Sequence, residues 1–300
     1  FQVESRAQMA TLPRMKPEHF YDIVVEVALI RPGPIVGNMV HPYLRRRRGD
    51  EPVTYDHPLL EPVLKRTLGV PLFQEQLLRM SMVVAGFSGG EAEELRRAMG
   101  FKRSVQRMEA IEKRLRDGMA GHGITGEAAD RIVKSISSFA LYGFPESHAA
   151  SFALIVYASA YLKAHYPAAF YTALLNNQPM GFYHPATLVK DAQRRGVRFD
   201  PVDVSVSRWD CAVQPTGAVR LGLRMVKGLR REVGERIVRG QVPDGRVPPV
   251  RSIDELASRA HVSREELRVL AEIGALACFG GDRRTALWQA ERAPEIPLLA

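Results

Sequence analysis

The stretch Tyr142-Gly143-Phe144-Pro145-Glu146-Ser147-His148-Ala149-Ala150-Ser151-Phe152-Ala153 is the most informative part of this chain. Its glycine and proline form a turn into a helix expected from about Ala149 to His165, with Ser147 as the N-cap. Because this helix is apolar on nearly every side, we expect it to be buried in a core. His148 lies where free backbone amides and the positive helix end favour a phosphate. The alternative is an ordinary capped core helix with an incidental histidine.

The composition indicates a protein with a real core and a polyanionic partner. The chain has 300 residues, enough for one large or two ordinary domains, and a formal net charge of +9 with arginine ahead of lysine. Arginine pairs with phosphate through a planar fork, although many basic proteins never contact nucleic acid. Cys211 and Cys278 have no metal-ligand spacing and form no disulfide framework, which fits a reducing cytoplasm. No bilayer-spanning run or signal peptide is present, so we expect a cytoplasmic protein without membrane contact.

The hydrophobic pattern of the first half predicts mostly helices. Pro17 opens a helix that ends near Arg31-Pro32-Gly33-Pro34, and a basic loop follows at Arg45 to Gly49. A short apolar run, Val70 to Phe73, predicts a strand that leads into a helix from Gln74 to Ala85. Ser88 and Glu91 form a capping box for a helix that ends at Gly100. Amphipathic helices are also expected around Val105 to Met119 and around Ile132 to Ile136.

The pattern changes after Asn176. A turn-rich connector runs from Gln178 to Pro185, so we place a domain boundary near residue 178. Alternating residues predict strands between Cys211 and Leu223, and two capping boxes, Ser252 with Glu255 and Ser263 with Glu266, predict short helices. The fold class is therefore mainly α, with a helical first domain and a small α+β region after it. Because the chain starts at Phe1, inside apparently structured sequence, we expect it to be a fragment.

Two further basic segments are candidates for phosphate binding. Arg96, Arg97, Lys102 and Arg103 crowd one helix end and the turn that follows it. Cations complement a helix C-terminus, and that accounts for one or two of them, so phosphate binding and this structural role are weighed equally. Arg31 lies in a turn stiffened by two prolines, where a solvated arginine is the alternative.

Other segments are candidates for contacts to DNA. Arg45, Arg46, Arg47 and Arg48 form either a solvated loop or a sequence-independent contact to the DNA backbone. The turn of Lys227, Gly228 and Arg230, and a second turn at Gly274, each join two short helices and can present amides to a DNA phosphate. A plain helix-turn-helix packing corner is an equal alternative for each.

One pentapeptide, Gln178-Pro179-Met180-Gly181-Phe182, matches a Gln-x-Met-x-Phe pattern of the type that binds sliding clamps. A match this loose usually arises by chance. It is the sole basis for expecting a sliding clamp among the partners. No nucleophile elbow, phosphate-binding Walker loop, zinc-type histidine pair or Asp-x-Asp dyad is present, so we assign no catalytic residue and no metal ligand to this sequence.

Taken in order, these segments resemble the α subunit of bacterial DNA polymerase III, the C-family replicative polymerase. The matching stretches are Phe1 to Arg6, Arg31 to Pro34, Phe73 to Gln76, Leu95 to Gly100, Tyr142 to Ala153 and Leu162 to Pro167. The sequence of Phe144 to Phe152, with Gln178 to Tyr183 and Arg208-Trp209-Asp210, is similar to that of the error-prone branch used in damage-induced translesion synthesis. Residues 179–276 resemble the tandem helix-hairpin-helix region of the family.

The resemblance implies a domain plan and a function. Residues 1–178 would be polymerase fingers, residues 179–276 a helix-hairpin-helix DNA-binding region, and residues 277–300 a helical tail or linker. The longer protein would be an error-prone DNA-directed DNA polymerase acting in DNA repair. The family's catalytic aspartates, which hold Mg²⁺, lie in an upstream palm domain that this sequence lacks, so the chain alone is expected to be inactive. The alternatives are a non-catalytic DNA-binding module with helix-hairpin-helix motifs and a protein-binding scaffold.

The resemblance also implies partners and site residues. The partners would be primer-template DNA, an incoming deoxynucleoside triphosphate and, with the sliding clamp, other translesion-synthesis proteins. The expected nucleotide-binding residues are Arg31, Arg96, Arg97, Lys102, Ser147 and His148, with the His148 ring facing the sugar. One departure concerns the first hairpin, where Gly228-Leu229-Arg230 replaces the family's Gly-x-Gly. The second glycine allows close approach of backbone to phosphate, so Arg230 would have to supply a side-chain contact instead.

Overall fold

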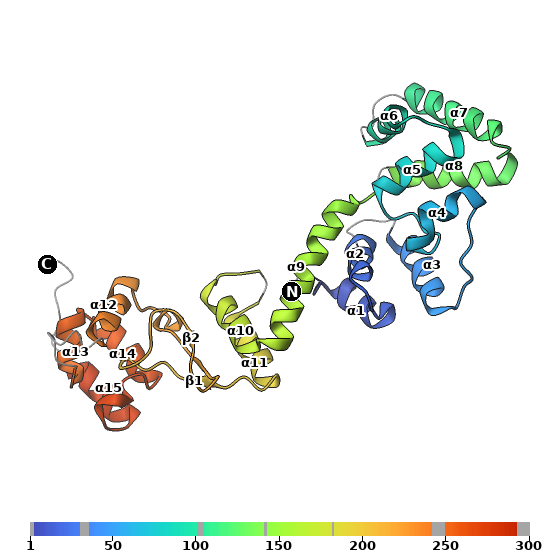
Figure 1. Ribbon diagram of the computed structural model, residues 1–300. Helices are drawn as coiled ribbons and strands as arrows, with labels where there is room; N and C mark the ends of the chain where they lie inside the picture. Colours follow the sequence, from blue (N-terminus) through green and yellow to red (C-terminus); the bar gives the residue numbers. More distant parts are fainter. Residues whose placement is uncertain are drawn as a thin grey trace. The chain divides into compact units, whose positions relative to one another are not determined.

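The computed structural model describes residues 3–30, 36–100, 105–140, 143–181, 183–241 and 250–292. The chain divides into two compact units, Phe1–Ala160 and Tyr161–Ala300, each of which is described by itself (Figure 1). The mainly α fold is confirmed, because helices make up most of the described elements and the strands form one small sheet. No helix among these residues combines the length and the apolar character needed to cross a bilayer.

Nine helices carry the described part of the first unit, and the last of them continues into the second. They are α1 (Arg6–Met15), α2 (Phe20–Leu29), α3 (Val36–Arg48), α4 (Glu61–Leu64), α5 (Gln74–Ala85), α6 (Gly89–Gly100), α7 (Val105–Gly121), α8 (Gly126–Ala140) and α9 (Glu146–His165), with 3-10 turns at Pro58–Leu60 and Lys65–Thr67. The predicted cap of α6 is confirmed: the Glu91 amide donates to Ser88 Oγ, and the Ser88 amide donates to the Glu91 carboxylate.

The first unit has two hydrophobic cores that meet at the start of α5. In one core, α5 packs against α6, α7 and α8, and buried side chains such as Met80, Leu95 and Leu115 fill the space between them. The other core gathers residues from α1, α2, α3 and α9 around the fully buried Phe73. Phe73 immediately precedes α5, so the first turn of this helix connects the two cores.

Gln76 explains why the predicted strand at Val70 to Phe73 is wrong. Its buried Oε1 accepts hydrogen bonds from the amides of Leu72 (2.8 Å) and Phe73 (3.0 Å). Its Nε2 donates to Thr67 Oγ1 at 2.8 Å. The amides that a strand would offer to a neighbour are therefore used by a side chain. Only a single parallel bridge, between Phe73 and Phe144, remains of strand pairing in this segment.

The helix that we expected to open at Pro17 begins at Phe20 instead. The Asp22 carboxylate accepts hydrogen bonds from the amides of Glu18 (2.8 Å) and His19 (2.9 Å). These two bonds hold the preceding residues outside the helix and satisfy donors at its N-terminus. The carboxylate of Asp22, the third residue of the helix, thus sets the start of α2. The proline at position 17 predicts an earlier start.

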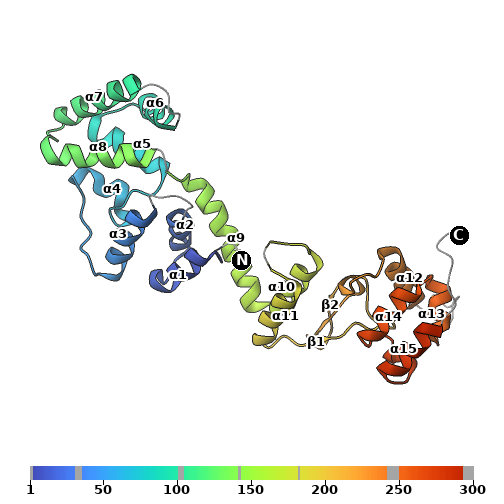
Figure 2. The same cartoon turned by 180° about the vertical axis from the view of Figure 1, so that it is seen from behind.

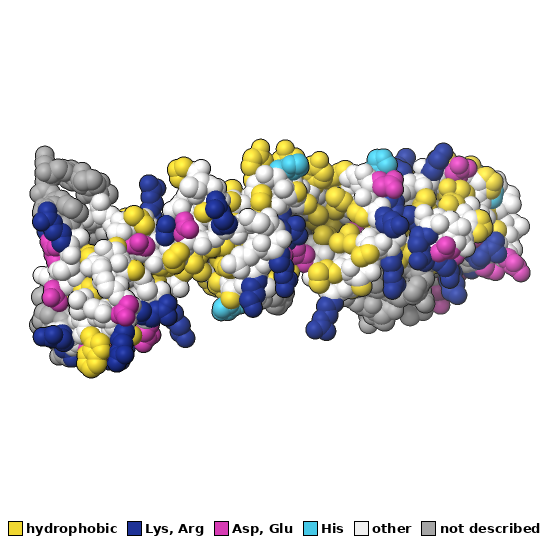
Figure 3. Space-filling view, turned by 90° about the horizontal axis from the view of Figure 1, so that it is seen from below, with side chains coloured by type: hydrophobic (Ala, Val, Ile, Leu, Met, Phe, Trp, Pro, Cys, Tyr) yellow, Lys and Arg dark blue, Asp and Glu magenta, His cyan; other side chains and the backbone are white. Residues whose placement is uncertain are grey.

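The expectation that the helix starting near Ala149 is buried on all sides is wrong. In α9, only Ala149, Ala153 and Val156 are buried, and they form one narrow stripe. Leu154 is 62% exposed and Tyr157 is 54% exposed, and hydrophobic side chains are visible on the surface along this stretch (Figure 3). A helix that is apolar all round carries no periodic signal for the face that packs.

The second unit begins with a pair of helices and a small sheet. Its elements are α10 (Pro167–Asn176), α11 (Pro185–Arg194), β1 (Phe199–Asp200), β2 (Ala212–Val213), β3 (Val219–Arg220), a 3-10 turn at Leu223–Met225, α12 (Arg231–Gln241), α13 (Ile253–Ala260), α14 (Arg264–Glu272), a 3-10 turn at Ala277–Phe279 and α15 (Arg283–Arg292). The strand order is β1-β3-β2, with β3 parallel to β1 and antiparallel to β2. β2 and β3 confirm the predicted strands, whereas the sequence pattern did not indicate β1.

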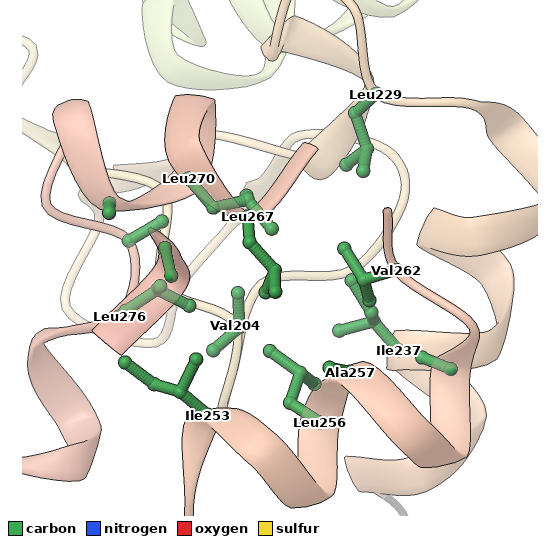
Figure 4. Close-up of a cluster of buried hydrophobic side chains, with 14 of the residues drawn as sticks. Val204, Leu229, Ile237, Ile253, Leu256, Ala257, Val262, Leu267, Leu270 and Leu276 are labelled. Carbon is green, nitrogen blue, oxygen red and sulfur yellow. The ribbon is translucent and has the colours of Figure 1, made fainter. Parts of the chain in front are cut away.

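The connector at residue 178 does not coincide with the division between the two units. It joins α10 and α11, which pack on each other through Tyr171, Leu175, Leu188 and Ala192 in a shared core. Turn-forming residues therefore mark a loop within one unit here. The remaining helices, α12 to α15, enclose a separate core to which Val204, Ile237, Leu256 and Leu267 contribute (Figure 4).

Gly118 provides a test of the packing between α5 and α7. A Cβ at this position would lie 2.2 Å from the Ala85 carbonyl oxygen, so the two helices could not keep their present separation. We expect Gly118→Ala to destabilise the chain by about 2–3 kcal/mol. The matched control is Gly121→Ala in the same helix, where a Cβ meets nothing within 4 Å and the free energy of unfolding should be unchanged or rise slightly. Equal effects of both changes in chemical denaturation would contradict the close contact.

Glu26 predicts a pH-dependent loss of stability. Its side chain is 0% exposed and neither carboxylate oxygen has a partner among the described residues. Burial raises its pKa to about 7. The unfolded chain releases this proton near pH 4.5, so stability is highest below that pH and falls as the pH rises through 7. This penalty is of the order of 3 kcal/mol.

The change Glu26→Gln should remove that part of the pH dependence. We expect the variant to gain about 3 kcal/mol on the wild type between pH 5 and pH 8, measured by chemical denaturation at both pH values. The control is Glu61→Gln, because Glu61 is exposed and should leave the pH profile as it is. A Glu26 variant whose profile parallels that of the wild type would disprove the assignment.

Candidate nucleotide and DNA sites

The start of α9 is held by the start of α5, although about 70 residues separate them in the chain. Gln74 Nε2 donates to the Gly143 carbonyl oxygen at 2.7 Å, and the Gln74 amide donates to the Phe144 carbonyl oxygen at 3.0 Å. The Phe144 amide in turn donates to the Leu72 carbonyl oxygen at 3.4 Å. The two sequence motifs Phe73-Gln74-Glu75-Gln76 and Tyr142 to Ala153 are therefore in direct contact.

Glu146, and not Ser147, begins the helix. Its amide donates to Glu75 Oε2 at 2.9 Å, so a carboxylate from α5 occupies the first amide of the positive helix end. Its own carboxylate accepts from the Tyr21 hydroxyl at 2.7 Å, and the Arg66 guanidinium carbon lies 3.5 Å from the centre of the Tyr21 ring. Burial and then the hydrogen bond to Glu146 raise the pKa of Tyr21. Ser147 lies in the first turn and is not the N-cap. The side chain of Glu75, from α5, accepts the hydrogen bond from the first amide of the helix instead.

His148 is exposed at this helix end, and its ring is placed by two aromatic neighbours. The ring centroid lies 5.3 Å from that of Phe144 and 4.7 Å from that of Phe152, the latter in an edge-on arrangement. No hydrogen bond to its ring nitrogens is present among the described residues. Both nitrogens are thus available to a ligand while the ring orientation is restrained.

Arg96 and Arg97 project from α6 and share one carboxylate. Glu93 accepts from Arg96 Nε at 2.9 Å and from Arg97 Nε at 3.0 Å, and these hydrogen bonds lower the pKa of Glu93 to about 2. Consecutive residues on a helix point about 100° apart, but both are three or four positions after Glu93, so it draws them to one side. Arg96 is 38% exposed and Arg97 is 73% exposed.

Glu75 connects this arginine pair to α9. The hydrogen bond with Glu93 raises the pKa of Arg96, and attraction by the nearby Glu75 carboxylate raises it further. Glu75 also accepts a hydrogen bond from the first amide of α9, the helix that carries Ser147 and His148. The two other predicted nucleotide contacts, Arg31 and Lys102, lie outside the described residues.

The four consecutive arginines at residues 45–48 do not form the predicted loop. They are the last turn of α3, and each is paired with a carboxylate: Arg45 and Arg46 with Glu51 (2.8 and 3.0 Å), Arg47 with Asp22 (2.7 Å) and Arg48 with Asp50 (3.1 Å). Arginine is a good helix former, and near a helix C-terminus its charge is favourable, so the run extends α3. The 13% and 20% exposures of the Arg46 and Arg47 side chains leave these two mainly internal.

In the first predicted hairpin, the turn precedes α12. Gly228 has a φ of +91°, which suits glycine, and space around it is open because an added Cβ would meet nothing within 4 Å. Lys227 is exposed, and its amide and that of Gly228 donate to no acceptor among the described residues. Two backbone donors and an ammonium group are therefore presented together at this turn.

Arg230 is bound to Glu266 and is not an open cation. Its amide and its Nε both donate to Glu266 Oε1 at 3.0 Å, and its Nη2 donates to Oε2 at 3.0 Å. Glu266 is only 4% exposed. Burial acts to raise the pKa of Glu266, but the hydrogen bonds from Arg230 and Ser263 outweigh it and hold the pKa below its ordinary value. The same carboxylate completes the confirmed capping box of α14.

Gly274 closes α14 and offers no free amides. With a φ of +78°, it is the left-handed residue after the helix. Its amide donates to the Ala271 carbonyl oxygen at 3.0 Å, and the Ala275 amide donates to the Leu270 carbonyl oxygen at 2.9 Å. This is the Schellman arrangement, in which the helix itself takes the donors of the turn. The geometry thus gives the second predicted hairpin turn a structural role.

The comparisons agree with this arrangement of helices. Residues 1–123 match the family described as bacterial DNA polymerase III alpha subunit finger domain, and residues 196–286 match a helix-hairpin-helix motif family. The chain belongs to the family of bacterial DNA polymerase III alpha subunits, of which it carries the finger domain and a helix-hairpin-helix region.

The names of curated relatives indicate which branch of this family the chain resembles. The chain is 54% identical over 300 residues to a protein of Anaeromyxobacter sp. (strain K) and 54% identical over 291 residues to one of Corynebacterium glutamicum, each named error-prone DNA polymerase. A protein of Mycobacterium bovis with the same name is 54% identical over 295 residues. These alignments cover 96%, 97% and 98% of this chain but only 26%, 27% and 27% of the relatives. The chain thus spans about a quarter of the length of these relatives.

Sequence reasoning missed three side chains that organise the site. Glu93 could have been found, because its spacing of three and four residues before the arginines predicts ion pairs on a helix. Tyr21 and Glu75 could not, since their partner Glu146 lies 125 and 71 residues away. The described residues contain no group of three or more histidine, cysteine, aspartate or glutamate side chains that could hold a metal ion, so no magnesium site is assigned to them.

The pair of Arg230 and Glu266 can be tested by a double-mutant cycle with Arg230→Gln and Glu266→Gln. Because the carboxylate is buried and receives three hydrogen bonds from Arg230, we expect a coupling free energy of about 1–3 kcal/mol in chemical denaturation. The control is Arg231 with Glu235, an exposed pair at 2.8 Å on α12, whose coupling should be below about 0.5 kcal/mol. Equal coupling in the two cycles would show that Arg230 is not committed to Glu266.

Proposed function

We propose that this chain supplies the incoming-nucleotide and DNA-backbone contacts of an error-prone DNA-directed DNA polymerase that acts in translesion synthesis and DNA repair. The observation that carries the proposal is the position of Glu75, whose carboxylate binds the first amide of α9 and whose charge also acts on Arg96. Donors from two helix ends that already accommodate one negative group are suited to the oxygens of a polyphosphate. The similarity to proteins named error-prone DNA polymerase supports the same activity for the longer protein.

The reaction joins the primer 3′-oxygen to the α-phosphorus of the nucleotide and expels pyrophosphate. Its catalysis is mostly positioning and charge stabilisation. In this proposal, Arg96 and Arg97 bind oxygens of the triphosphate and stabilise the charge that accumulates on the leaving pyrophosphate. His148, restrained by Phe144 and Phe152, faces the sugar. Arg31 and Lys102 remain predicted supporting contacts.

Chemistry that magnesium ions supply, namely activation of the attacking oxygen and neutralisation of the phosphates, is assigned to residues outside this chain. The described residues contain no acidic cluster for such ions, so we expect residues 1–300 alone not to extend a primer. DNA backbone contacts are assigned to the turn of Lys227 and Gly228, where two amides and an ammonium group lie together. A sliding clamp stays a predicted partner, because Phe182 of the pentapeptide lies outside the described residues.

The test is primer extension by the full-length polymerase with Arg96→Ala or Arg97→Ala. A charge-assisted hydrogen bond to the triphosphate is worth about 1.5–3 kcal/mol, so each change should raise the KM for the incoming nucleotide about 10- to 100-fold. Affinity for primer-template DNA should not change. The matched control is Arg116→Ala on α7, an exposed guanidinium that, like Arg96 and Arg97, is paired with carboxylates, in this case those of Glu112 and Asp130.

Removing Arg96 also leaves Glu93 with one cation fewer, and this effect must be separated from loss of a triphosphate contact. Repeating Arg96→Ala in a Glu93→Gln background does so, because the freed carboxylate is then absent. A KM increase that persists in this background supports direct binding. Undiminished extension at low nucleotide concentration in both backgrounds would exclude Arg96 from the nucleotide site.

A further inference from the structure

A basic cleft lies between the C-terminal ends of α1 and α3, and none of the residues that the proposed function assigns to nucleotide or DNA contacts lines it. Its volume is about 860 Å³. The residues that line it are Pro13, Arg14, Met15, Lys16, Glu18, His19, Arg46, Arg47, Arg48 and Leu68. Five of these side chains are permanently cationic and only Glu18 is acidic, so the lining is strongly biased toward an anionic occupant.

The inner cations of this cleft are used by the fold. Arg47 donates to the Asp22 carboxylate at 2.7 and 2.8 Å and to the Lys16 carbonyl oxygen at 3.0 Å. Arg46 donates to Glu51 at 3.0 Å and to the Leu68 carbonyl oxygen at 2.8 Å. The bonds of Arg47 tie α3 to the end of α1, and each of the two guanidinium groups has a carboxylate partner, although Glu51 also pairs with Arg45. The inner cations of the cleft are therefore less available to a ligand than the outer ones.

The outer cations are different. Arg14 and Lys16 are both exposed, and neither pairs with a carboxylate among the described residues. Lys16 adopts a left-handed backbone conformation with a φ of +46°, and its carbonyl oxygen is held by Arg47, so the base of its side chain is fixed while its ammonium group stays open. Arg48, 47% exposed, pairs with Asp50 at 3.1 Å on the same side.

The chemistry of the lining discriminates between a free nucleotide and a nucleic-acid backbone. A nucleobase is held by stacking on an aromatic ring or by amide and hydroxyl hydrogen bonds. The cleft lining contains no Phe, Tyr or Trp and no Asn, Gln, Ser or Thr among the described residues, and its one aromatic side chain is His19, whose Nδ1 lies 3.9 Å from the Asp22 carboxylate. A lining with unpaired cations and a single imidazole favours phosphates that are read by charge over a nucleobase.

We propose that Arg14 and Lys16, at the rim of this cleft, bind the sugar–phosphate backbone of DNA without regard to sequence. This proposal rests on the proposed function, since it gives a polymerase finger domain a DNA contact of its own, apart from the nucleotide site and from the helix-hairpin-helix turn. It also changes the prediction made from the arginine run: the cations available to DNA come from the end of α1, and most of the run forms their support.

The experiment measures binding of residues 1–300 to duplex DNA by fluorescence anisotropy between about 50 and 200 mM salt. The test variant is Arg14→Gln with Lys16→Asn, because asparagine tolerates the left-handed conformation at position 16. Losing two phosphate contacts should lower the magnitude of the slope of log K against log salt by about 1.8, from about 0.9 per phosphate of duplex DNA. The loss should be the same for DNA of any sequence.

The matched control is Lys113→Gln with Lys134→Gln, which removes two exposed cations from α7 and α8 and should leave the slope unchanged. The unfolding midpoint of each variant must equal that of the wild type. The single change Arg14→Glu keeps Lys16 and reverses one charge, so it should weaken DNA binding more than Arg14→Gln does.

Three results would overturn the proposal: a slope that falls equally in test and control variants, a loss that depends on sequence, or unchanged DNA binding with weaker binding of a free nucleotide. These outcomes are independent of the KM for the incoming nucleotide in the Arg96 and Arg97 variants. Failure of one proposal is thus distinguishable from failure of the other.

Discussion

The hydrogen bonds between the first turn of α5 and the start of α9 are the constraint on which the first unit depends. Gln74 and Glu75 hold Gly143, Phe144 and Glu146 through backbone atoms, so these bonds require this particular backbone path but little of the side chains there. Gln76, the residue after Glu75, accepts hydrogen bonds from the amides of Leu72 and Phe73, the last two residues before α5. One short motif therefore joins two cores and orients the helix that carries His148.

Many arginines of this protein are paired with carboxylates of the same chain. The arginines at 45–48, the pair on α6 and Arg230 all have carboxylate partners. Exposed pairs of this kind contribute little to stability, but they orient guanidinium groups and reduce self-repulsion in a chain with a net charge of +9. A count of basic residues accordingly overestimates the surface available to phosphate. Arg14, Lys16 and Lys227, the cations assigned to DNA, are exposed and lie at the ends of elements.

Glycine turns and a buried carboxylate also organise the second unit. Gly228 and Gly274 share a left-handed conformation, but only the first leaves amides without acceptors. Glu266 caps its own helix and, at the same time, binds the arginine that follows the Gly228 turn. The first turn is thus held in place by the second helical pair, within one shared core.

Local signals in the sequence determined most of the helices, the cap of α6 by Ser88 and Glu91, the capping box of α14, and the strands β2 and β3, because these depend on neighbours within a few residues. The motifs quoted from the sequence also identified the family. Only the tertiary structure decided which face of α9 is buried, which carboxylate caps it, and which cations stay unpaired. The contacts responsible, such as Glu75 with Glu146 and Arg47 with Asp22, join residues 71 and 25 positions apart. No periodicity or spacing encodes such pairs, since their energy depends on burial and geometry that exist only in the folded chain.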